Sequence, residues 1–552
     1  MKFGFLKYTL LAAALVALTS NGVAKTRNDF NLGRNMEIVV NLMHILSTQY
    51  VDKVDADEMA QNAAYGICSV LDPYTQFIPE KDWEEFERQT RGHYGGIGSL
   101  IRKKDDYVII AEPYAGSPAD EAGLKIGDKI VAIDGKSMCK ENINEVSKLL
   151  RGEPNTTVTV TVERLLTGER EEIKIRRRRI VLPSITYAGY VADGVGYIRH
   201  DDFTENCYNH MRAAIKHLQN TGELKSLILD YRNNGGGLLS SAVDILSLFV
   251  PKNTMVVEIR GRDGKSKKLY TSHDPLLPDT PLAVLINGNS ASAAEIVAGT
   301  LQDLDRGVLL GQRSYGKGLV QTTMSASHNA YVKVTTHKYY IASGRCIQAT
   351  KFSADGRAMP VADSLIKEFK TAGGRKVYDG GGIMPDKKVE PKYISTFAMI
   401  LSLMGVVDDF GDEYMKRNHT KSIDVRNFSI TDADYEEFIK LAMEHDIPYQ
   451  SESRAALEKL RNSLKKERND SLKEALDAID KGLKDDKRSC LDTFRKEIIE
   501  QINQNIVLRY AYSKGVIIHS LKDDVELAAA KELLANKEEY KHIITKQDTE
   551  RK

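Results

Sequence analysis

Between about Val181 and Pro391, short apolar runs alternate with amphipathic segments of helical length, and this alternation restricts the fold more than any other feature. SLILDYR and LAVLING have the length and apolarity of buried strands, whereas NCYNHMRAAIKHLQN and SAAEIVAGTLQDL repeat with a helical period. Strands that alternate with helices predict an α/β layer structure. Because 552 residues exceed what one hydrophobic core organises, we expect a multidomain α+β protein.

The N-terminus begins MKFGFLKYTLLAAALVALTSNGVAKT, in which Lys2 and Lys7 precede an apolar run from Leu10 to Leu18 and small residues end at Ala24. This order is typical of a cleaved secretory signal peptide. The apolar run is shorter than the roughly 20 residues that a spanning helix needs. We therefore expect a signal peptide over residues 1–24, export of the chain, and no stable transmembrane anchor.

Changes in composition and hydrophobic period along the chain predict four further regions. The turn Asp72-Pro73-Tyr74 closes a helical N-terminal stretch, and short glycine-separated β runs follow it. A basic stretch around Lys174 is expected to be a solvated strand or linker. The last residues are rich in Lys, Glu, Leu and Ala and predict helices that either pack on the core or offer an oligomerisation surface. The predicted regions are a helical domain (25–91), a β-rich module (92–165), an α/β core (166–395) and a helical C-terminal region (396–552).

Composition argues against several functional classes. The formal net charge of +1 gives no overall field that would attract nucleic acid, and the basic stretch has no interleaved aromatic residues. The five cysteines are scattered and show no metal-ligand spacing, so we expect buried free thiols and neither a metal nor a cofactor.

Ser292 lies where an apolar strand, Leu282 to Ile286, passes through a turn into a helix. A helix N-terminus presents free backbone N–H groups and a positive dipole end, both of which stabilise an oxyanion during acyl transfer. Ser292-Ala-Ala-Glu295 also fits a capping box, in which the serine only caps the helix. Both interpretations are open at this point.

Lys317 favours the catalytic interpretation. It lies between two glycines and before apolar residues, in a segment expected to be largely buried. Burial favours the neutral amine, which can take a proton from a serine hydroxyl, and serine–lysine pairs are a known variant of hydrolase machinery. Gln321, four residues later, could orient the amine. A surface lysine in a glycine loop is the alternative.

The run Asn233-Asn234-Gly235-Gly236-Gly237 follows another apolar strand and lets the backbone approach a ligand closely. It lacks the G-K-[ST] ending of a phosphate-binding loop, so an oxyanion-binding amide at Gly236 suits it better. His200 and His337 offer a serine–histidine alternative, with His337 as the reserve base.

Five motifs together make the chain resemble the carboxyl-terminal processing peptidases, or tail-specific proteases, over about residues 28–391. They are DYRNNGGG, SASAAEI, YGKGLVQ, SGRCIQ and DGGGIMPD. The resemblance implies a core of the ClpP/crotonase-like fold and a PDZ domain for the β-rich module. It also implies Ser292 as nucleophile, Lys317 as base and Gln321 as its orienting residue.

By the same resemblance, the amides of Gly236 and Ala293 would form the oxyanion hole. Many relatives carry proline where this chain has Gly235, so the turn could be looser here. The loop Gly96-Ile97-Gly98-Ser99 would capture a chain-terminal carboxylate, with the peptide added as an extra strand.

We therefore expect an exported serine endopeptidase, in the periplasm or cell envelope, that cleaves proteins near apolar C-terminal tails. A homo-oligomer or an activating adaptor is left open. The alternative is an inactive PDZ-bearing scaffold that binds C-termini in the envelope.

Overall fold

The computed structural model describes residues 27–83, 86, 92–352, 358–469, 471–483 and 486–545. The predicted signal peptide lies outside these residues. They fall into two compact units. The first unit draws on the segments 27–83 and 321–335, and the second unit contains most of the rest.

The first unit contains the predicted helical N-terminal region. Its elements include α2 (Arg27–Gln49), α3 (Ala56–Ser69) and the short strand β1 (Gln76–Ile78). Helix α3 begins after Asp55, whose carboxylate accepts the amides of Asp57 and Glu58 at 2.9 and 3.1 Å. Strand β1 pairs antiparallel with Tyr331–Lys333 at the start of a long strand, β18 (Ala330–Ile341).

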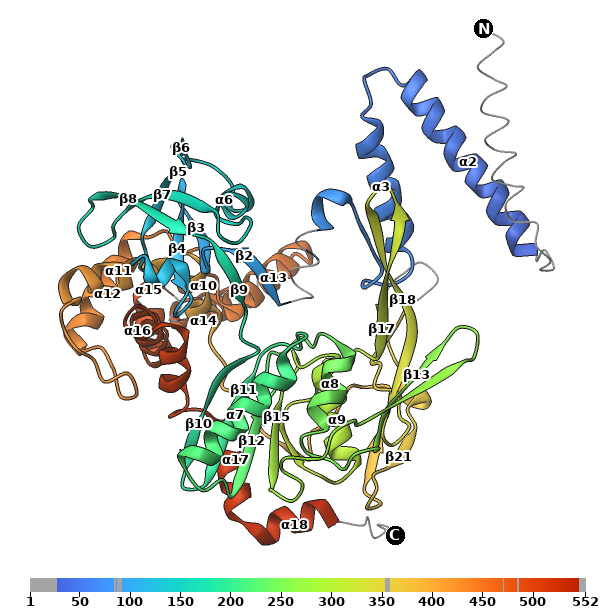
Figure 1. Ribbon diagram of the computed structural model, residues 1–552. Coiled ribbons are helices and arrows are strands. Elements are labelled where there is room, and N and C mark those ends of the chain that lie inside the picture. Colours follow the sequence, from blue (N-terminus) through green and yellow to red (C-terminus); the bar gives the residue numbers. More distant parts are fainter. Residues whose placement is uncertain are drawn as a thin grey trace. The chain divides into compact units, whose positions relative to one another are not determined.

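A six-stranded sheet organises the second unit (Figure 1). Its order is β10 (Ile185–Ala192), β11 (Val195–His200), β12 (Ser226–Asp230), β15 (Leu282–Ile286), β16 (Val308–Gly311) and β23 (Lys387–Lys388). The pairs from β11 to β23 are parallel, and β10 is antiparallel to β11. Every residue of β12, β15 and β16 is buried, as expected for parallel strands covered on both faces.

Helices cover both faces of this sheet. One face packs against α7 (Cys207–Thr221), α8 (Leu239–Leu246) and α9 (Ala293–Asp303). The other face packs against α17 (Val525–Ala535) and the following α18 (Lys537–Thr545). Leu527 and Leu533 of α17 are fully buried in the same cluster as Leu285 and Leu310 of the sheet. The α/β core predicted from the sequence is confirmed, and its second face is supplied from the C-terminal end of the chain.

The β-rich module forms a second six-stranded sheet. Its strands are β3 (Ser99–Lys104), β4 (Tyr107–Pro113), β5 (Lys129–Ile133), β6 (Lys136–Ser137), β7 (Thr157–Glu163) and β8 (Arg170–Arg176), with helices α5 (Pro118–Glu121) and α6 (Ile143–Leu150). The sheet continues past residue 165, the boundary predicted from the sequence, because β8 pairs with β7 along its length. Ile173 and Ile175 face the core while Lys174 is exposed, so the basic stretch begins as a strand. It continues into β9 (Arg178–Val181), which pairs with β2 (His93–Gly96).

The helical C-terminal region packs around its own apolar core, which includes Phe397, Phe410 and Phe438. Its principal helices are α10 (Thr396–Leu403), α11 (Val406–Asn418), α12 (Asp432–Glu444), α15 (Lys487–Thr493) and α16 (Arg495–Ser520). None of the helices described is long and apolar enough to cross a membrane. All five cysteines lie within the described ranges and are free, but only Cys207 and Cys490 are buried.

Candidate active site

Ser292 occupies a strained turn between β15 and α9. Its backbone has φ +56° and ψ −115°, a region that residues with a Cβ rarely enter. Helix α9, which begins at Ala293, is buried along its whole length, and Ser292 at its entrance keeps part of its surface exposed. Strained backbone conformations that the surrounding structure holds in place are concentrated at functional sites. The geometry therefore presents the Ser292 side chain at the edge of a fixed core.

The carboxylate of Glu295 joins the two residues singled out by sequence. Its Oε2 accepts the amides of Ser292 and Lys317 at 2.8 and 2.9 Å, and its Oε1 accepts the Gly316 amide at 2.7 Å and the Ser314 hydroxyl at 2.5 Å. Since one carboxylate oxygen accepts both amides, two hydrogen bonds through Glu295 connect the main chains of Ser292 and Lys317. Burial raises the pKa of Glu295 to about 7, although these four hydrogen bonds oppose the rise.

Tyr339 of β18 holds the same two residues through their carbonyl groups. Its hydroxyl donates to the Lys317 carbonyl and lies 3.3 Å from the Ser292 carbonyl oxygen. The Tyr339 side chain is only 1% exposed, so its position is fixed by packing. Ser292 and Lys317 are thus linked twice, by a carboxylate on their amides and by a phenol on their carbonyls. The Lys317 side chain is half-buried.

Sequence reasoning assigned Glu295 only to a capping box, and the bond from the Ser292 amide to its carboxylate belongs to that box. It missed the bonds to Lys317 and its neighbours. The available signal was a carboxylate among the small and apolar residues that begin α9. A charged group in such a helix requires buried partners, which α9 itself does not offer.

Gly236 lies directly against the turn at Ser292. A Cβ at this position would approach Ser292 Cβ and Ala293 N to 2.8 Å, and its φ of +96° also favours glycine. The structure therefore brings together Ser292, Ala293 and Gly236. The Gly236 amide donates to Asn234 Oδ1 at 2.8 Å, so it must leave this partner before it can bind an oxyanion.

The neighbouring serine, Ser290, is held differently. It is fully buried, and its hydroxyl donates to the Tyr231 carbonyl at 2.8 Å while accepting the Asn287 amide at 2.9 Å. These bonds connect the turn after β15 to the end of β12. Of the two serines in the SASA segment, Ser292 is the one at the exposed turn.

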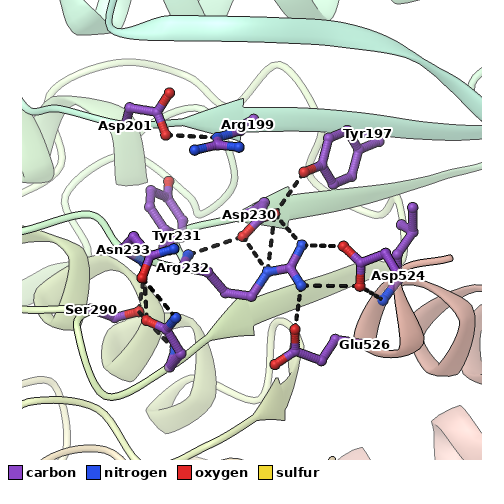
Figure 2. A network of polar contacts seen from close by, with 12 residues as sticks. Tyr197, Arg199, Asp201, Asp230, Tyr231, Arg232, Asn233, Ser290, Asp524 and Glu526 are labelled. Atoms are coloured by element: carbon purple, nitrogen blue, oxygen red, sulfur yellow. Dashed lines mark hydrogen bonds and ion pairs between the residues drawn. The ribbon is translucent and has the colours of Figure 1, made fainter. Parts of the chain in front are cut away.

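Figure 2 shows the polar contacts of Asp230 and Arg232, which lie at the start of the DYRNNGGG motif. The Arg232 guanidinium binds Asp230 Oδ2 at 2.6 Å, Asp524 Oδ2 at 2.6 Å and the carboxylate of Glu526. Tyr197 donates to Asp230 at 2.6 Å. Burial alone would raise the pKa of Asp230, but Arg232 lowers it. Arg232 therefore ties the end of β12 to the start of α17.

Residues of two other motifs bind α9 and Ser314 and so hold the site in place. Arg345 of SGRCIQ forms a fully buried ion pair with Asp303 of α9 at 2.8 Å. Ile383 of DGGGIMPD donates its amide to the Ser314 hydroxyl at 2.6 Å, and Ser314 in turn binds Glu295. These motifs fix helix α9 and the carboxylate that it carries.

The two histidines lie in different surroundings. His200 is completely buried against Phe203 and Tyr231, and burial lowers its pKa to about 3, so it stays neutral. His337, on β18 opposite Gly261, has Nδ1 at 2.8 Å from the Thr336 hydroxyl.

Gln321 belongs to the first unit. It is the third residue of β17 (Leu319–Ser327), and its Nε2 donates to Thr335 Oγ1 at 3.1 Å. This bond fixes the side-chain amide within that unit.

The predicted carboxylate-binding loop connects β2 to β3. Ile97, Gly98 and Ser99 line a pocket of about 260 Å³ together with β3 and α6 residues, including Leu100, Ile101, Ile143, Ser147 and Leu150. Gly98 has φ +77°, and its carbonyl accepts the Ser117 hydroxyl at 2.7 Å. The Ser117 hydroxyl therefore anchors the loop where it lines the pocket.

Family models match three parts of the chain. Residues 194–357 match "Peptidase family S41", residues 109–164 match "PDZ domain", and residues 397–534 match "Probable PDZ-protease, C-terminal helical domain".

Curated relatives share much of the length. A carboxy-terminal-processing protease of Bartonella bacilliformis is 33% identical over 370 residues, which cover 66% of this chain and 83% of that protein. A probable CtpA-like serine protease of Staphylococcus aureus is 32% identical over 351 residues, 63% of this chain and 68% of that protein. Among solved structures, a photosystem II D1 C-terminal processing protease is 25% identical, with a TM-score of 0.35, over 64% of this chain and 88% of that one.

Proposed function

This chain belongs to the carboxyl-terminal processing proteases of peptidase family S41, and from that membership we propose an exported serine endopeptidase with Ser292 as nucleophile and Lys317 as general base. The observation that carries the proposal is the buried Glu295 carboxylate, which takes the amides of both residues on one oxygen. Such a contact holds the main chains of the nucleophile and the base in register.

In the proposed reaction, the neutral Lys317 amine takes the proton of Ser292 as Oγ attacks the scissile carbonyl carbon. The C–N bond then breaks, Lys317 returns the proton to the departing amine, and an ester to Ser292 remains. Lys317 next takes a proton from water as the water oxygen attacks the ester. The C–O bond to Ser292 then breaks, Lys317 returns the proton to Ser292 Oγ, and the product acid leaves. Gln321 serves to orient the lysine amine.

The oxyanion in this scheme is bound by the amides of Ala293 and Gly236. Ala293 is the first residue of α9, where the helix dipole favours negative charge. Gly236 packs against the turn but donates to Asn234. We propose that a substrate carbonyl oxygen displaces Asn234 from this amide, so that the site completes itself only when substrate is bound.

The PDZ domain is proposed to select the substrate. The loop formed by Gly96, Ile97, Gly98 and Ser99 would bind the terminal carboxylate, and the pocket lined by Leu100 and Ile143 would take an apolar side chain. Proteins with apolar C-terminal tails are therefore the proposed substrates. The signal-like N-terminus supports export to the periplasm or cell envelope.

The direct test is turnover of an unstructured peptide with an apolar C-terminus by Ser292→Ala and Lys317→Ala, with Ser290→Ala as the matched serine control. The proposal predicts loss of cleavage in the first two variants and retained peptide binding by all three. Near-normal turnover by either dyad variant would refute the assignment. Binding without cleavage by the wild-type chain would instead support a scaffold.

A further inference from the structure

The turn Asp72-Pro73-Tyr74 and its neighbour Thr75 hold a buried carboxylate in the first unit. Oδ1 of Asp72 accepts the amides of Tyr74 and Thr75, both at 2.8 Å, and Oδ2 accepts the Thr75 hydroxyl at 3.0 Å. Asp72 is 9% exposed and Thr75 is 5% exposed. All of these contacts donate to the carboxylate, so Asp72 is fixed as a hydrogen-bond acceptor.

A chain of hydrogen bonds runs from this carboxylate to Gln321. Thr335 Oγ1 lies 3.2 Å from Asp72 Oδ1, and Gln321 Nε2 lies 3.1 Å from Thr335 Oγ1. The Thr335 amide also donates to the Thr75 hydroxyl at 3.2 Å, which holds β18 against the turn. The chain joins a segment before residue 80 to strands β17 and β18.

The direction of these bonds follows from the chemistry of the groups. A carboxylate only accepts, so the single hydroxyl proton of Thr335 goes to Asp72. The Thr335 oxygen can then only accept from Gln321, which requires the amino group of the amide on that side. The carbonyl oxygen of Gln321 is therefore the atom left to accept a further hydrogen bond.

We propose that Asp72 and Thr335 are positioning residues, which fix the Gln321 amide so that its carbonyl oxygen is presented as the acceptor. This inference rests on the proposed role of Gln321 in orienting the general base. An acceptor suits that role because it binds an N–H of the lysine and leaves the nitrogen lone pair for the serine proton. A reversed amide would donate to that lone pair and occupy it.

The test is steady-state cleavage of an apolar-tailed peptide by the full-length chain carrying Thr335→Val, which removes the hydroxyl and keeps the shape. We expect kcat to fall at least about tenfold, the scale of losses on removing a supporting hydrogen bond, with KM within about twofold. Thr335→Ser should restore kcat, because it restores the hydroxyl. Thr323→Val on β17 removes a hydroxyl that is not part of the hydrogen-bond chain, and its kcat should match that of wild type.

A double-mutant cycle separates positioning from general support. If Thr335 acts through Gln321, Thr335→Val added to Gln321→Ala should lower kcat no further than Gln321→Ala alone. Full additivity of the two losses, or wild-type kcat in Thr335→Val, would overturn the inference. Thermal midpoints show whether each variant folds, and Thr335→Ala replaces Thr335→Val if the latter does not.

Failure of this inference is distinguishable from failure of the proposed function. An inactive Lys317→Ala together with a fully active Thr335→Val would refute the positioning role and leave the dyad intact. An active Lys317→Ala would refute the dyad itself.

Discussion

Replacing Glu295 with glutamine perturbs the connection between Ser292 and Lys317 most selectively. Each oxygen of the carboxylate takes two donors, so a glutamine places its amino group opposite either Ser292 and Lys317 or Gly316 and Ser314. Two buried donors then lose their acceptor in either orientation. The volume and shape of the side chain are unchanged, so packing around α9 is retained.

Two opposing free energies follow from this change. Two unsatisfied buried donors cost about 2–6 kcal/mol in total. Against this, Glu295 has its pKa raised from 4.5 to about 7 by burial, and at about 1.4 kcal/mol per pKa unit its ionised form costs about 3 kcal/mol above pH 7. Glutamine removes that cost.

The pH dependence has a defined sign. A carboxyl whose pKa is raised on folding stabilises the folded state fully below about pH 4.5 and loses this contribution as the pH rises through 7. The wild-type core should therefore lose about 3 kcal/mol between pH 4.5 and 8, whereas Glu295→Gln should not. The variant should be clearly less stable than wild type at pH 5 and close to it at pH 8.

Hydrogen exchange of α9 peptides, corrected for the intrinsic rate at each pH, measures this local stability in a multidomain chain. Peptidase activity at pH 8 should fall at least about tenfold in Glu295→Gln, because in either orientation two of the donors that hold Ser292 and the Ser314–Lys317 segment lose their acceptor although the fold persists. Glu368→Gln, which changes an exposed carboxyl on strand β21 (Glu368–Lys370), is the control. The same pH dependence of α9 stability in wild type and Glu295→Gln, or full activity of the variant, would refute this role of Glu295.

Two further predictions concern the same site. Gly236→Ala should abolish peptide cleavage, because its Cβ would lie 2.8 Å from Ser292 Cβ. Gly235→Ala, with no atom within 4 Å of its Cβ, should retain activity in the same assay. Equal activities of the two variants would contradict the close packing at Gly236. Tyr339→Phe should reduce thermal stability by about 1 kcal/mol and lower kcat, because the carbonyls of Ser292 and Lys317 lose their shared donor; an unchanged kcat would contradict this role.

Local pattern was sufficient to predict the layers of the core and the placement of Ser292. The apolar run ending at Ile286 and the helical period after Ala293 are local signals, and the structure has a strand and a helix there. The positive φ of Ser292 was not predictable, because serine has no intrinsic preference for that region. It is imposed by the packed surround.

Contacts between distant segments account for what the sequence did not reveal. Glu295 and Tyr339 contact Lys317 only because β15, α9 and β18 fold together. The apolar face of α17 has a clear helical pattern, but nothing in that pattern identifies the sheet containing Leu285 as its partner. The Asn234 bond to Gly236 likewise depends on a turn geometry that composition does not determine.

The most direct measurement is the mass of the enzyme during turnover of an activated ester of an apolar-tailed peptide, quenched in acid and digested. We expect one acyl group on the peptide that contains Ser292, and formation of this adduct should slow sharply in Lys317→Ala. An acyl group on any other residue, or equal rates of acylation with and without the Lys317 amine, would contradict it.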